Sequence, residues 1–303
     1  MSSLSFNEHH SRIIQYGAKE LVLGNRSGGD STRYYLNEFF LQRPALNTVL
    51  TTDFDNADAT NASNTTIRTA EKVANRNFEL GGTNMTTALC TFEYNTGRVG
   101  ILLTTAGADD DQAIVLPHLD NGGDKGTSQS AWNSTLWGTE NQVVWECAIF
   151  TKITADSVTA TSFWAGLKKT NTGAFATDTD QAYFLYSADV THGTLTTYDN
   201  LHFIYSIAGS NYITDLGIAV AQNTIYRLRI EIDVNRQISV YVNEVLYGLN
   251  ITTTIATQSD TGIKSLALTN DVDLIPYVGL QSLALATKKL TLCYEKISRL
   301  LFE

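Results

Sequence analysis

Three polar residues near the end of one predicted strand, Glu231, Asp233 and Asn235, have a spacing that acid–base chemistry could use. Every second residue of an extended strand points to the same face, so these side chains would lie together. Glycoside cleavage with retention of configuration needs two carboxyl groups about 5–5.5 Å apart, one of which protonates the leaving oxygen. The amide at position 235 cannot supply that proton. We therefore expect Glu231 and Asp233 to be outward residues paired with arginines of the same hairpin, and the chain not to be an enzyme.

A second group of carboxylates, Asp109, Asp110 and Asp111, could bind a divalent cation such as Ca²⁺. Neighbouring residues of an extended chain point to opposite sides, so a turn would have to gather the three side chains. The five histidines show no metal-ligand spacing. We expect no metal and no cofactor, and these three aspartates are the remaining candidates for a Ca²⁺ site.

Aromatic side chains in polar surroundings are the third kind of candidate. Trp132 and Trp137 belong to a Gly-, Ser- and Asn-rich stretch at 122–138, where they could stack on a sugar ring. Trp164 could do the same, although aromatic residues in sandwiches are more often core. Trp132 and Trp137 are therefore the candidate glycan-binding residues.

The elements that would position these residues are strands. In 223–248, apolar and polar residues alternate in two runs separated by a short polar break, which predicts a half-buried β-hairpin. A one-residue slip would bury the charged face, so the register should be firmly set. The side chains expected in the core are Leu228, Ile230, Ile232, Ile238, Val240 and Val242.

The rest of the chain predicts an all-β fold. Short apolar runs follow one another with Asp, Thr, Asn and Gly between them and with little helical periodicity, which is typical of an antiparallel two-sheet β-sandwich of the jelly-roll type. The run VVWECAIF at 143–150 is apolar on both faces, as expected of a central strand.

Composition excludes several classes of function. A net charge of −10 argues against a broad phosphate-binding surface, so nucleic acid is not an expected partner. The sequence has no apolar run of membrane-spanning length and begins without a signal-peptide pattern, which predicts no membrane association and synthesis in a cytoplasm. The odd number and wide separation of Cys90, Cys147 and Cys293 predict buried free thiols.

The N-terminal segment differs from the remainder of the chain. A Gly-rich break at 24–31 precedes four aromatic residues, Tyr34, Tyr35, Phe39 and Phe40. We predict an arm or attachment segment at 1–45, with these aromatic side chains as anchors, and a β-sandwich domain at 46–303. The alternative is that the segment forms a first strand or short helix covering one edge of the main core.

Several segments resemble known families. The series YRLRIEIDVNRQISVYVNEVLYG, LIPYVGLQ and a final strand ending in ISRLL resembles the second half of a concanavalin A-like lectin/glucanase sandwich. Glucanases of this fold carry a Glu-x-Asp-x-Glu strand, whose last position is Asn235 here. More narrowly, TTAGADDDQAIVLPHLD, WGTENQVVWECAIFT, FWAGLKKT, DTDQAYF and LIPYVGLQ resemble virion structural proteins of tailed bacteriophages, particularly marine ones.

The resemblance, which covers about 100–303, implies a function. The chain would be a noncatalytic virion component, a sandwich that decorates the capsid or forms part of a fibre or knob. It would lie on the particle surface as a homo-oligomer, with other virion proteins of the capsid shell or tail as partners. The alternative is a glycan-binding adhesin for host surface carbohydrate, and a less favoured one is a glycoside hydrolase of the same fold.

Overall fold

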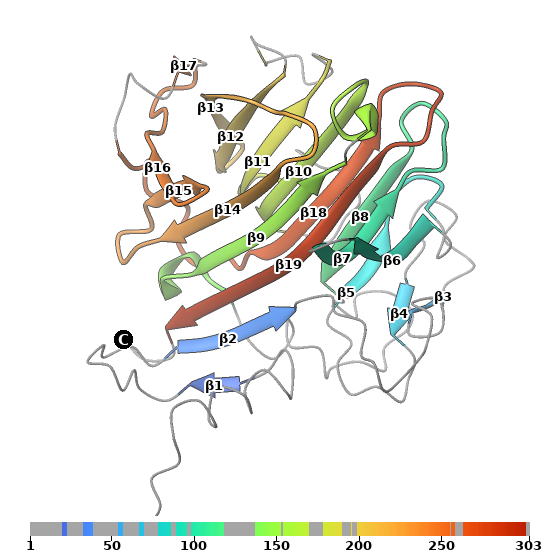
Figure 1. The fold of residues 1–303 in the computed structure, drawn as a ribbon. Helices are drawn as coiled ribbons and strands as arrows, with labels where there is room; N and C mark the ends of the chain where they lie inside the picture. The colour runs from blue at the N-terminus through green and yellow to red at the C-terminus, as the bar shows by residue number, and fades with distance from the viewer. Residues whose placement is uncertain are drawn as a thin grey trace, which may run out of the picture.

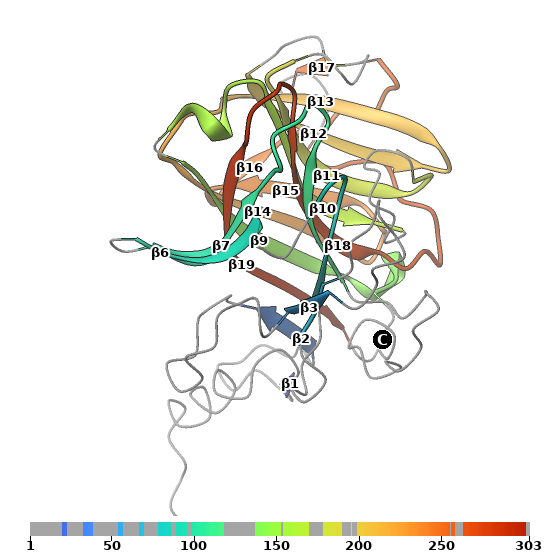
Figure 2. The same cartoon turned by 90° about the vertical axis from the view of Figure 1, so that its right-hand side faces the viewer.

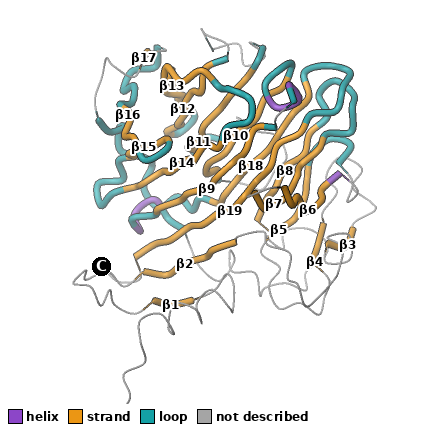
Figure 3. The backbone as a smooth tube through the Cα atoms, in the orientation of Figure 1, coloured by secondary structure: helices purple, strands orange, loops and turns teal. Residues whose placement is uncertain are grey.

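The structure, a computed structural model, describes residues 20–22, 33–38, 54–56, 67–69, 78–85, 89–95, 98–117, 137–152, 154–169, 178–189, 195, 199–254, 256–257 and 263–300. Within these ranges the chain consists of strands, connecting loops and short 3₁₀ segments, among them η2 (Thr139–Asn141) and η3 (Ala155–Ser157) (Figure 3). None of the described helices has the length and apolar character needed to cross a membrane.

The first of two large sheets has nine strands and contains the predicted hairpin. Its order is β1-β2-β19-β9-β14-β15-β16, and β7 also pairs with β19 and carries β6 at its outer side. Figure 2 shows the β6–β7 hairpin extending away from the body of the molecule. The strands are β1 (Glu20–Val22), β2 (Arg33–Glu38), β6 (Cys90–Asn95), β7 (Arg98–Thr104), β9 (Val144–Thr151), β14 (Ile225–Ile232), β15 (Ile238–Val242), β16 (Val245–Tyr247) and β19 (Lys289–Leu300).

The second sheet has eight strands in the order β17-β13-β12-β11-β10-β18-β8-β5. It lies behind the first sheet in Figure 1. Its strands are β5 (Phe78–Gly81), β8 (Gln112–Pro117), β10 (Thr161–Lys168), β11 (Gln181–Ser187), β12 (Asn200–Ile207), β13 (Ser210–Ala219), β17 (Ala256–Thr257) and β18 (Ile275–Ser282). The short strands β3 (Phe54–Asn56) and β4 (Ile67–Thr69) form a separate two-stranded sheet.

These features confirm the predicted two-sheet, jelly-roll sandwich. Every pairing between described strands is antiparallel except the short β13–β17 pair. Consecutive strands β10, β11, β12 and β13 are neighbours in one sheet, as short connections favour. Hairpins of consecutive strands also occur in the first sheet, in β1–β2, β6–β7 and β14–β15–β16, whereas β9, β18 and β19 pair with strands from distant parts of the sequence.

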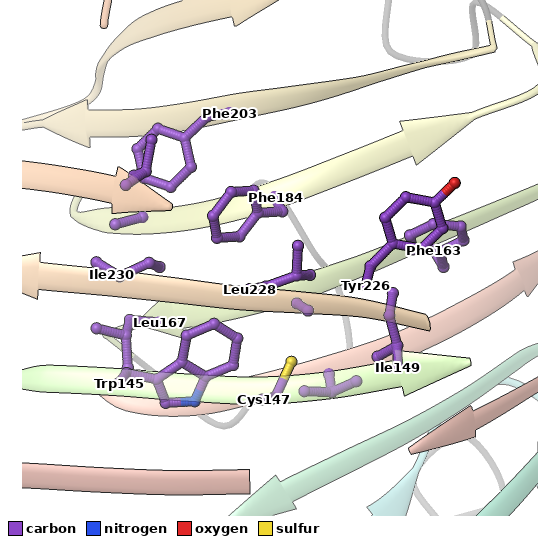
Figure 4. Close-up of a cluster of buried hydrophobic side chains, with 14 of the residues drawn as sticks. Trp145, Cys147, Ile149, Phe163, Leu167, Phe184, Phe203, Tyr226, Leu228 and Ile230 are labelled. Atoms are coloured by element: carbon purple, nitrogen blue, oxygen red, sulfur yellow. The ribbon is translucent and has the colours of Figure 1, made fainter. Parts of the chain in front are cut away.

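The core lies between the two sheets. Figure 4 shows side chains of β9 and β14, among them Trp145, Leu228 and Ile230, directed toward Phe184 and Phe203 of the other sheet. Alternation places these residues on the inner face of each strand, because successive side chains of a strand point to opposite faces. All five are 0% exposed, so the interior is continuous from one sheet to the other.

The hairpin prediction is confirmed in both burial and register. Leu228 pairs with Val242, Ile230 with Val240 and Ile232 with Ile238, as the alternation requires. These six side chains are at most 2% exposed. Cys90 and Cys147 are buried free thiols as expected, whereas the free thiol of Cys293 is only partly buried.

Strand β19 contains a β-bulge at Cys293. Leu292 pairs with Ile149 and Tyr294 with Ala148, so one residue of β19 has no counterpart on β9. The extra residue reverses the alternation. Leu290 and Leu292 are buried before the bulge, and Glu295 and Ile297 are buried after it.

The same edge of β19 pairs with two different strands. Its first part, 289–292, pairs with β7, and its second part, 295–300, pairs with β2. Beside the bulge, β7 comes so close that a Cβ atom on Gly100 would lie 2.3 Å from the carbonyl oxygen of Leu292. A glycine is required at this contact because any side chain would collide with the backbone of β19.

The N-terminal segment thus contributes strands to the nine-stranded sheet. Tyr34 and Tyr35 belong to β2, where they pair in register with Arg299 and Ser298. The attachment role of 1–45 and the edge-covering alternative both stay predictions. Phe39 and Phe40 lie outside the described residues, and the domain boundary at residue 45 stays a prediction.

Candidate functional site

The strand with the near-match to a catalytic pattern carries carboxylates that are held in structural contacts. Glu231 forms an ion pair with Arg229 at 3.2 Å between Oε1 and Nε, and its Oε2 accepts a hydrogen bond from the Tyr241 hydroxyl at 3.3 Å. The guanidinium group of Arg229 lies 4.0 Å from the centroid of the Tyr241 ring. The predicted pairing of Glu231 with an arginine is confirmed.

Asp233 differs from the expectation in partner and position. Strand β14 ends at Ile232, so Asp233 lies in the turn, where its Oδ1 accepts the backbone N–H groups of Asn235 (2.8 Å) and Gln237 (2.9 Å). Lys264, and not an arginine, pairs with its Oδ2 at 2.7 Å. Burial acts to raise the pKa of Asp233, but these hydrogen bonds and the Lys264 charge hold it below its usual value. The carboxylate therefore organises the turn.

The three consecutive aspartates lie in a turn that gives each a different environment. Asp111 is 1% exposed and accepts hydrogen bonds from the backbone N–H groups of Gly107 (2.7 Å) and Ala108 (2.5 Å). Asp110 adopts a left-handed conformation with φ of 63° and accepts a hydrogen bond from Gln281, while Asp109 is exposed. No group of three or more metal-ligating His, Cys, Asp or Glu side chains is found among the described residues. The carboxylates of Asp110 and Asp111 are thus engaged by protein donors, and the Ca²⁺ hypothesis for 109–111 stays a prediction.

Trp137, one of the two candidate glycan-binding residues, lies in the core and not on the surface. The residue is 1% exposed and belongs to the core between the sheets. Its backbone carbonyl accepts the N–H of Leu274, and the following Gly138 forms a β-bridge with Asp273. Trp137 therefore closes the sandwich at this end, where its ring has no exposed face for a sugar. Trp132 lies outside the described residues.

A group of aromatic residues, of which only Trp164 was a candidate from the sequence, lies on the other face of the eight-stranded sheet. Trp164 of β10, Tyr183 of β11 and Tyr277 of β18 alternate with core residues and so point away from the first sheet. The rings of Trp164 and Tyr277 stack with centroids 5.7 Å apart. We call these three residues the aromatic platform.

A glycine allows the aromatic platform to lie close to the sheet. A Cβ atom on Gly279 would lie 2.5 Å from the ring of Trp164, so a larger residue would displace the indole. Gly279 is opposite Trp164 in the β10–β18 ladder. A glycine adds nothing to the alternation of apolar and polar residues along a strand. The sequence therefore contained no sign that Gly279 makes room for the Trp164 ring.

The aromatic platform also includes polar groups. The ammonium of Lys168 lies 4.5 Å from the centroid of the Tyr277 ring, and burial lowers the pKa of Lys168 to about 8, an effect that Asp178 partly opposes. The hydroxyl of Tyr277 is buried and has no hydrogen-bond partner among the described residues. Burial raises the pKa of Tyr277 well above its usual value. The three rings of the aromatic platform are 0–1% exposed. Together with Leu195 they belong to a second, smaller core.

His202, on the same face, gives a pH-dependent prediction. It is 0% exposed, and burial lowers its pKa from 6.5 even though the Asp215 carboxylate acts in the opposite direction. The unfolded chain therefore binds a proton at His202 more readily than the folded protein does. We expect the stability from this residue to be complete above pH 6.5 and to fall as the pH falls from 6.5 toward the folded-state pKa. Urea unfolding of the wild type and of His202→Gln across this range measures the effect, and equal pH slopes would contradict it.

Comparisons with known proteins were made at the levels of sequence and structure. No family model and no curated protein matches the sequence. Among solved structures, a protein of unknown function from Shewanella oneidensis MR-1 is 8% identical, with 99% of this chain and 96% of that chain covered and a TM-score of 0.48.

Two further similar structures are of proteins whose names state a function. The potassium-bound carbohydrate recognition domain of Emp46p is 7% identical, with 73% of this chain and 88% of that chain covered and a TM-score of 0.43. A glycoside hydrolase family 16 endo-glucanase from Bacteroides ovatus is 8% identical, with 86% and 99% covered and a TM-score of 0.42. The carbohydrate recognition and the glucanase activity are properties of those two proteins, and identities of 7% and 8% do not transfer them to this chain.

Proposed function

We propose that this chain is a noncatalytic structural protein of a bacteriophage virion, a sandwich that decorates the capsid or forms part of a fibre or knob. It lies on the particle surface, and other virion proteins are its partners. The proposal rests on the position of the phage-like sequence segments in the fold, where they form neighbouring strands at the centre of the sandwich.

These segments build the centre of the sandwich. Residues 104–117 form the Asp111 turn and β8, 137–151 form η2 and β9, and the remaining segments lie in β10, β11 and β18. Strands β8, β18, β10 and β11 are consecutive neighbours in the eight-stranded sheet, and β9 is central in the other. The resemblance therefore concerns residues that determine the architecture, which supports a shared sandwich with those virion proteins.

The noncatalytic part of the proposal rests on the described carboxylates of the hairpin. Glu231 is bonded to Arg229 and Tyr241, Asp233 is bonded to turn N–H groups and Lys264, and position 235 is an amide. The hydrogen bonds and the Lys264 charge hold the pKa of Asp233 below its usual value, so this carboxyl group is not a proton donor near neutral pH. This hairpin lacks the acid–base pair of a retaining glycosidase.

Localisation in the particle tests the virion role. An antibody raised against the purified chain is used for immunogold labelling of intact particles of the phage that encodes it. We expect regular labelling, over the icosahedral shell for a decoration protein or at the tail for a fibre or knob. Particles that contain no copy of the chain by both labelling and mass spectrometry would rule out the role.

An activity assay tests the noncatalytic part separately. The purified chain is expected to release no reducing ends and no unsaturated products from a panel of α-glucans, β-glucans and uronate polysaccharides. Glu231→Gln is the matched control, since it removes the candidate nucleophile of the hairpin while keeping its shape. Turnover by the wild type that disappears in Glu231→Gln would contradict the proposal.

Carbohydrate recognition is the second candidate, and the buried Tyr277 hydroxyl is the observation that favours it. The rings of the aromatic platform are 0–1% exposed, so they offer no open face for stacking, and a sugar would reach this hydroxyl only after a change in this face of the sheet. The buried hydroxyl without a described partner is the group that a ligand would satisfy. Glycan-array binding by the full chain that is lost in Tyr277→Phe would favour this candidate, whereas a blank array together with blank saturation-transfer NMR would exclude it.

A further inference from the structure

Strand β16 forms an exposed apolar edge of the nine-stranded sheet. It is the last strand of that sheet beyond β15, and no described strand pairs with its other side. Figure 1 shows β15 and β16 at the left side of the molecule. Val245 and Leu246 of β16 are 55% and 41% exposed. They point to opposite faces of the sheet, because successive side chains of a strand alternate, so the edge is apolar on both faces.

The apolar edge continues past β16 with the segment 263–268. Ala267 forms an antiparallel bridge with Gln237, the residue just before β15. Since β14 takes the other side of β15, this segment and β16 lie along the same side. Ile263 and Leu266 are also exposed, so four of the eight large apolar side chains that are exposed among the described residues belong to this edge. A concentration of exposed apolar side chains at one place marks an interaction surface.

The charged side chains beside this edge have partners within the chain. Arg229 pairs with Glu244 of the β15–β16 turn at 3.5 Å and with Glu231 at 3.2 Å. Lys264 pairs with Asp233 at 2.7 Å. A molecule that covered the edge would therefore not have to bury these charges unpaired, which is the costly case. Strand β16 itself, with the sequence VLY, has neither the lysine nor the proline that commonly protects a sheet edge from association.

We propose that two copies of this chain associate through β16, which pairs antiparallel with itself about a two-fold axis at Leu246. In this register Leu246 is opposite its own copy, and Val245 is opposite Tyr247 of the second copy, so apolar side chains meet along the whole strand. Glu244 is opposite Gly248, which keeps the two carboxylates apart. The edge is thus complementary to itself, as a two-fold interface requires. Backbone hydrogen bonds would join the two sheets, and the proposal does not depend on the virion role.

Cysteine substitutions test the register of this pairing. In a Cys293→Ser background, which removes the partly buried thiol, Leu246→Cys places two thiols opposite each other across the axis, at a separation that a disulfide can bridge. After oxidation of the full chain we expect roughly tenfold more cross-linked dimer than with Val245→Cys, whose counterpart is Tyr247. Mixing differently tagged Val245→Cys and Tyr247→Cys chains should restore the cross-link, as a heterodimer.

Analytical ultracentrifugation tests the association itself. We expect the unmodified chain to dimerise as its concentration rises, and Leu246→Lys to be monomeric because the two lysines would repel each other across the axis. Ile225→Lys is the matched control, since Ile225 is similarly exposed at 37% but belongs to β14, and it should dimerise like the wild type. Circular dichroism checks that each variant is folded, and if Leu246→Lys is not, the cross-link at position 246 decides. A wild type that stays monomeric at its highest soluble concentration would overturn the proposal, and so would a dimer that shows no cross-link at position 246.

Discussion

Replacing Ile230 by alanine is expected to lower the free energy of unfolding by about 2–5 kcal/mol, since the change removes a fully buried side chain and leaves a cavity. Ile230 is 0% exposed, and it is paired with Val240 on one side and Trp145 on the other. The surrounding residues come from three strands of one sheet and face the rings of the opposite sheet, so they cannot collapse easily into the space. Urea denaturation followed by tryptophan fluorescence measures the loss.

A substitution on the same strand provides the control. Ile225 begins β14 and is 37% exposed, so Ile225→Ala removes the same atoms from a position already in contact with water. We expect its effect to be well below 1 kcal/mol, as is usual for surface substitutions. Equal losses at positions 225 and 230 would contradict the packing described for the hairpin.

Replacing Asp111 by alanine is expected to cost about 3 kcal/mol, because the change removes a buried carboxylate that accepts three hydrogen bonds. The carboxylate accepts bonds from the backbone N–H groups of Gly107 and Ala108 and from Nδ2 of Asn84, at 2.7, 2.5 and 2.6 Å. The backbone of Asp111 also accepts a bond from the N–H of Ser282, so the turn connects β7 and β8 to the end of β18. Thermal unfolding by differential scanning calorimetry measures the change.

The neighbouring Asp109 serves as the matched control. Asp109→Ala removes the same charge from an exposed side chain two positions away, so stability should change by less than about 0.5 kcal/mol. If addition of Ca²⁺ raised the melting temperature of the wild type and not that of Asp111→Ala, the structural role assigned to this carboxylate would be wrong. We expect Ca²⁺ to have no such effect.

The hairpin could be predicted from sequence because each of its two strands has one face that is more exposed to solvent and one that is buried. Arg227 and Glu231 alternate with Leu228 and Ile230, and this period of two determines both the burial and the register. The jelly-roll class followed from the repetition of short strands. The pairing of β9 with β14 and β19 could not be predicted, because strand partners distant in sequence leave no local pattern.

The candidate site was harder to predict, because the surroundings of a residue in sequence differ from its surroundings in space. Trp137 follows a polar stretch, yet it packs into the core at the point where that stretch joins the sheet. Trp164 lies in a run that is buried on both faces, so alternation could not separate its inner side from its outer side. Asp111 appeared as one of three equivalent carboxylates, and only the turn geometry distinguishes it.

At the bulge in β19, the number of residues between Leu292 and Tyr294 matters more for the fold than the identity of the residue at position 293. Substituting Cys293 by serine or alanine leaves the count of residues unchanged, and both halves of the strand keep their buried faces. Deleting one residue there, or inserting one, would turn every side chain of one half to the opposite face. Glu295 and Ile297 would then point outward, and Tyr294 and Lys296 would face the core. Among homologues of this protein, position 293 should therefore vary in identity while the spacing between Leu292 and Tyr294 stays free of insertions and deletions.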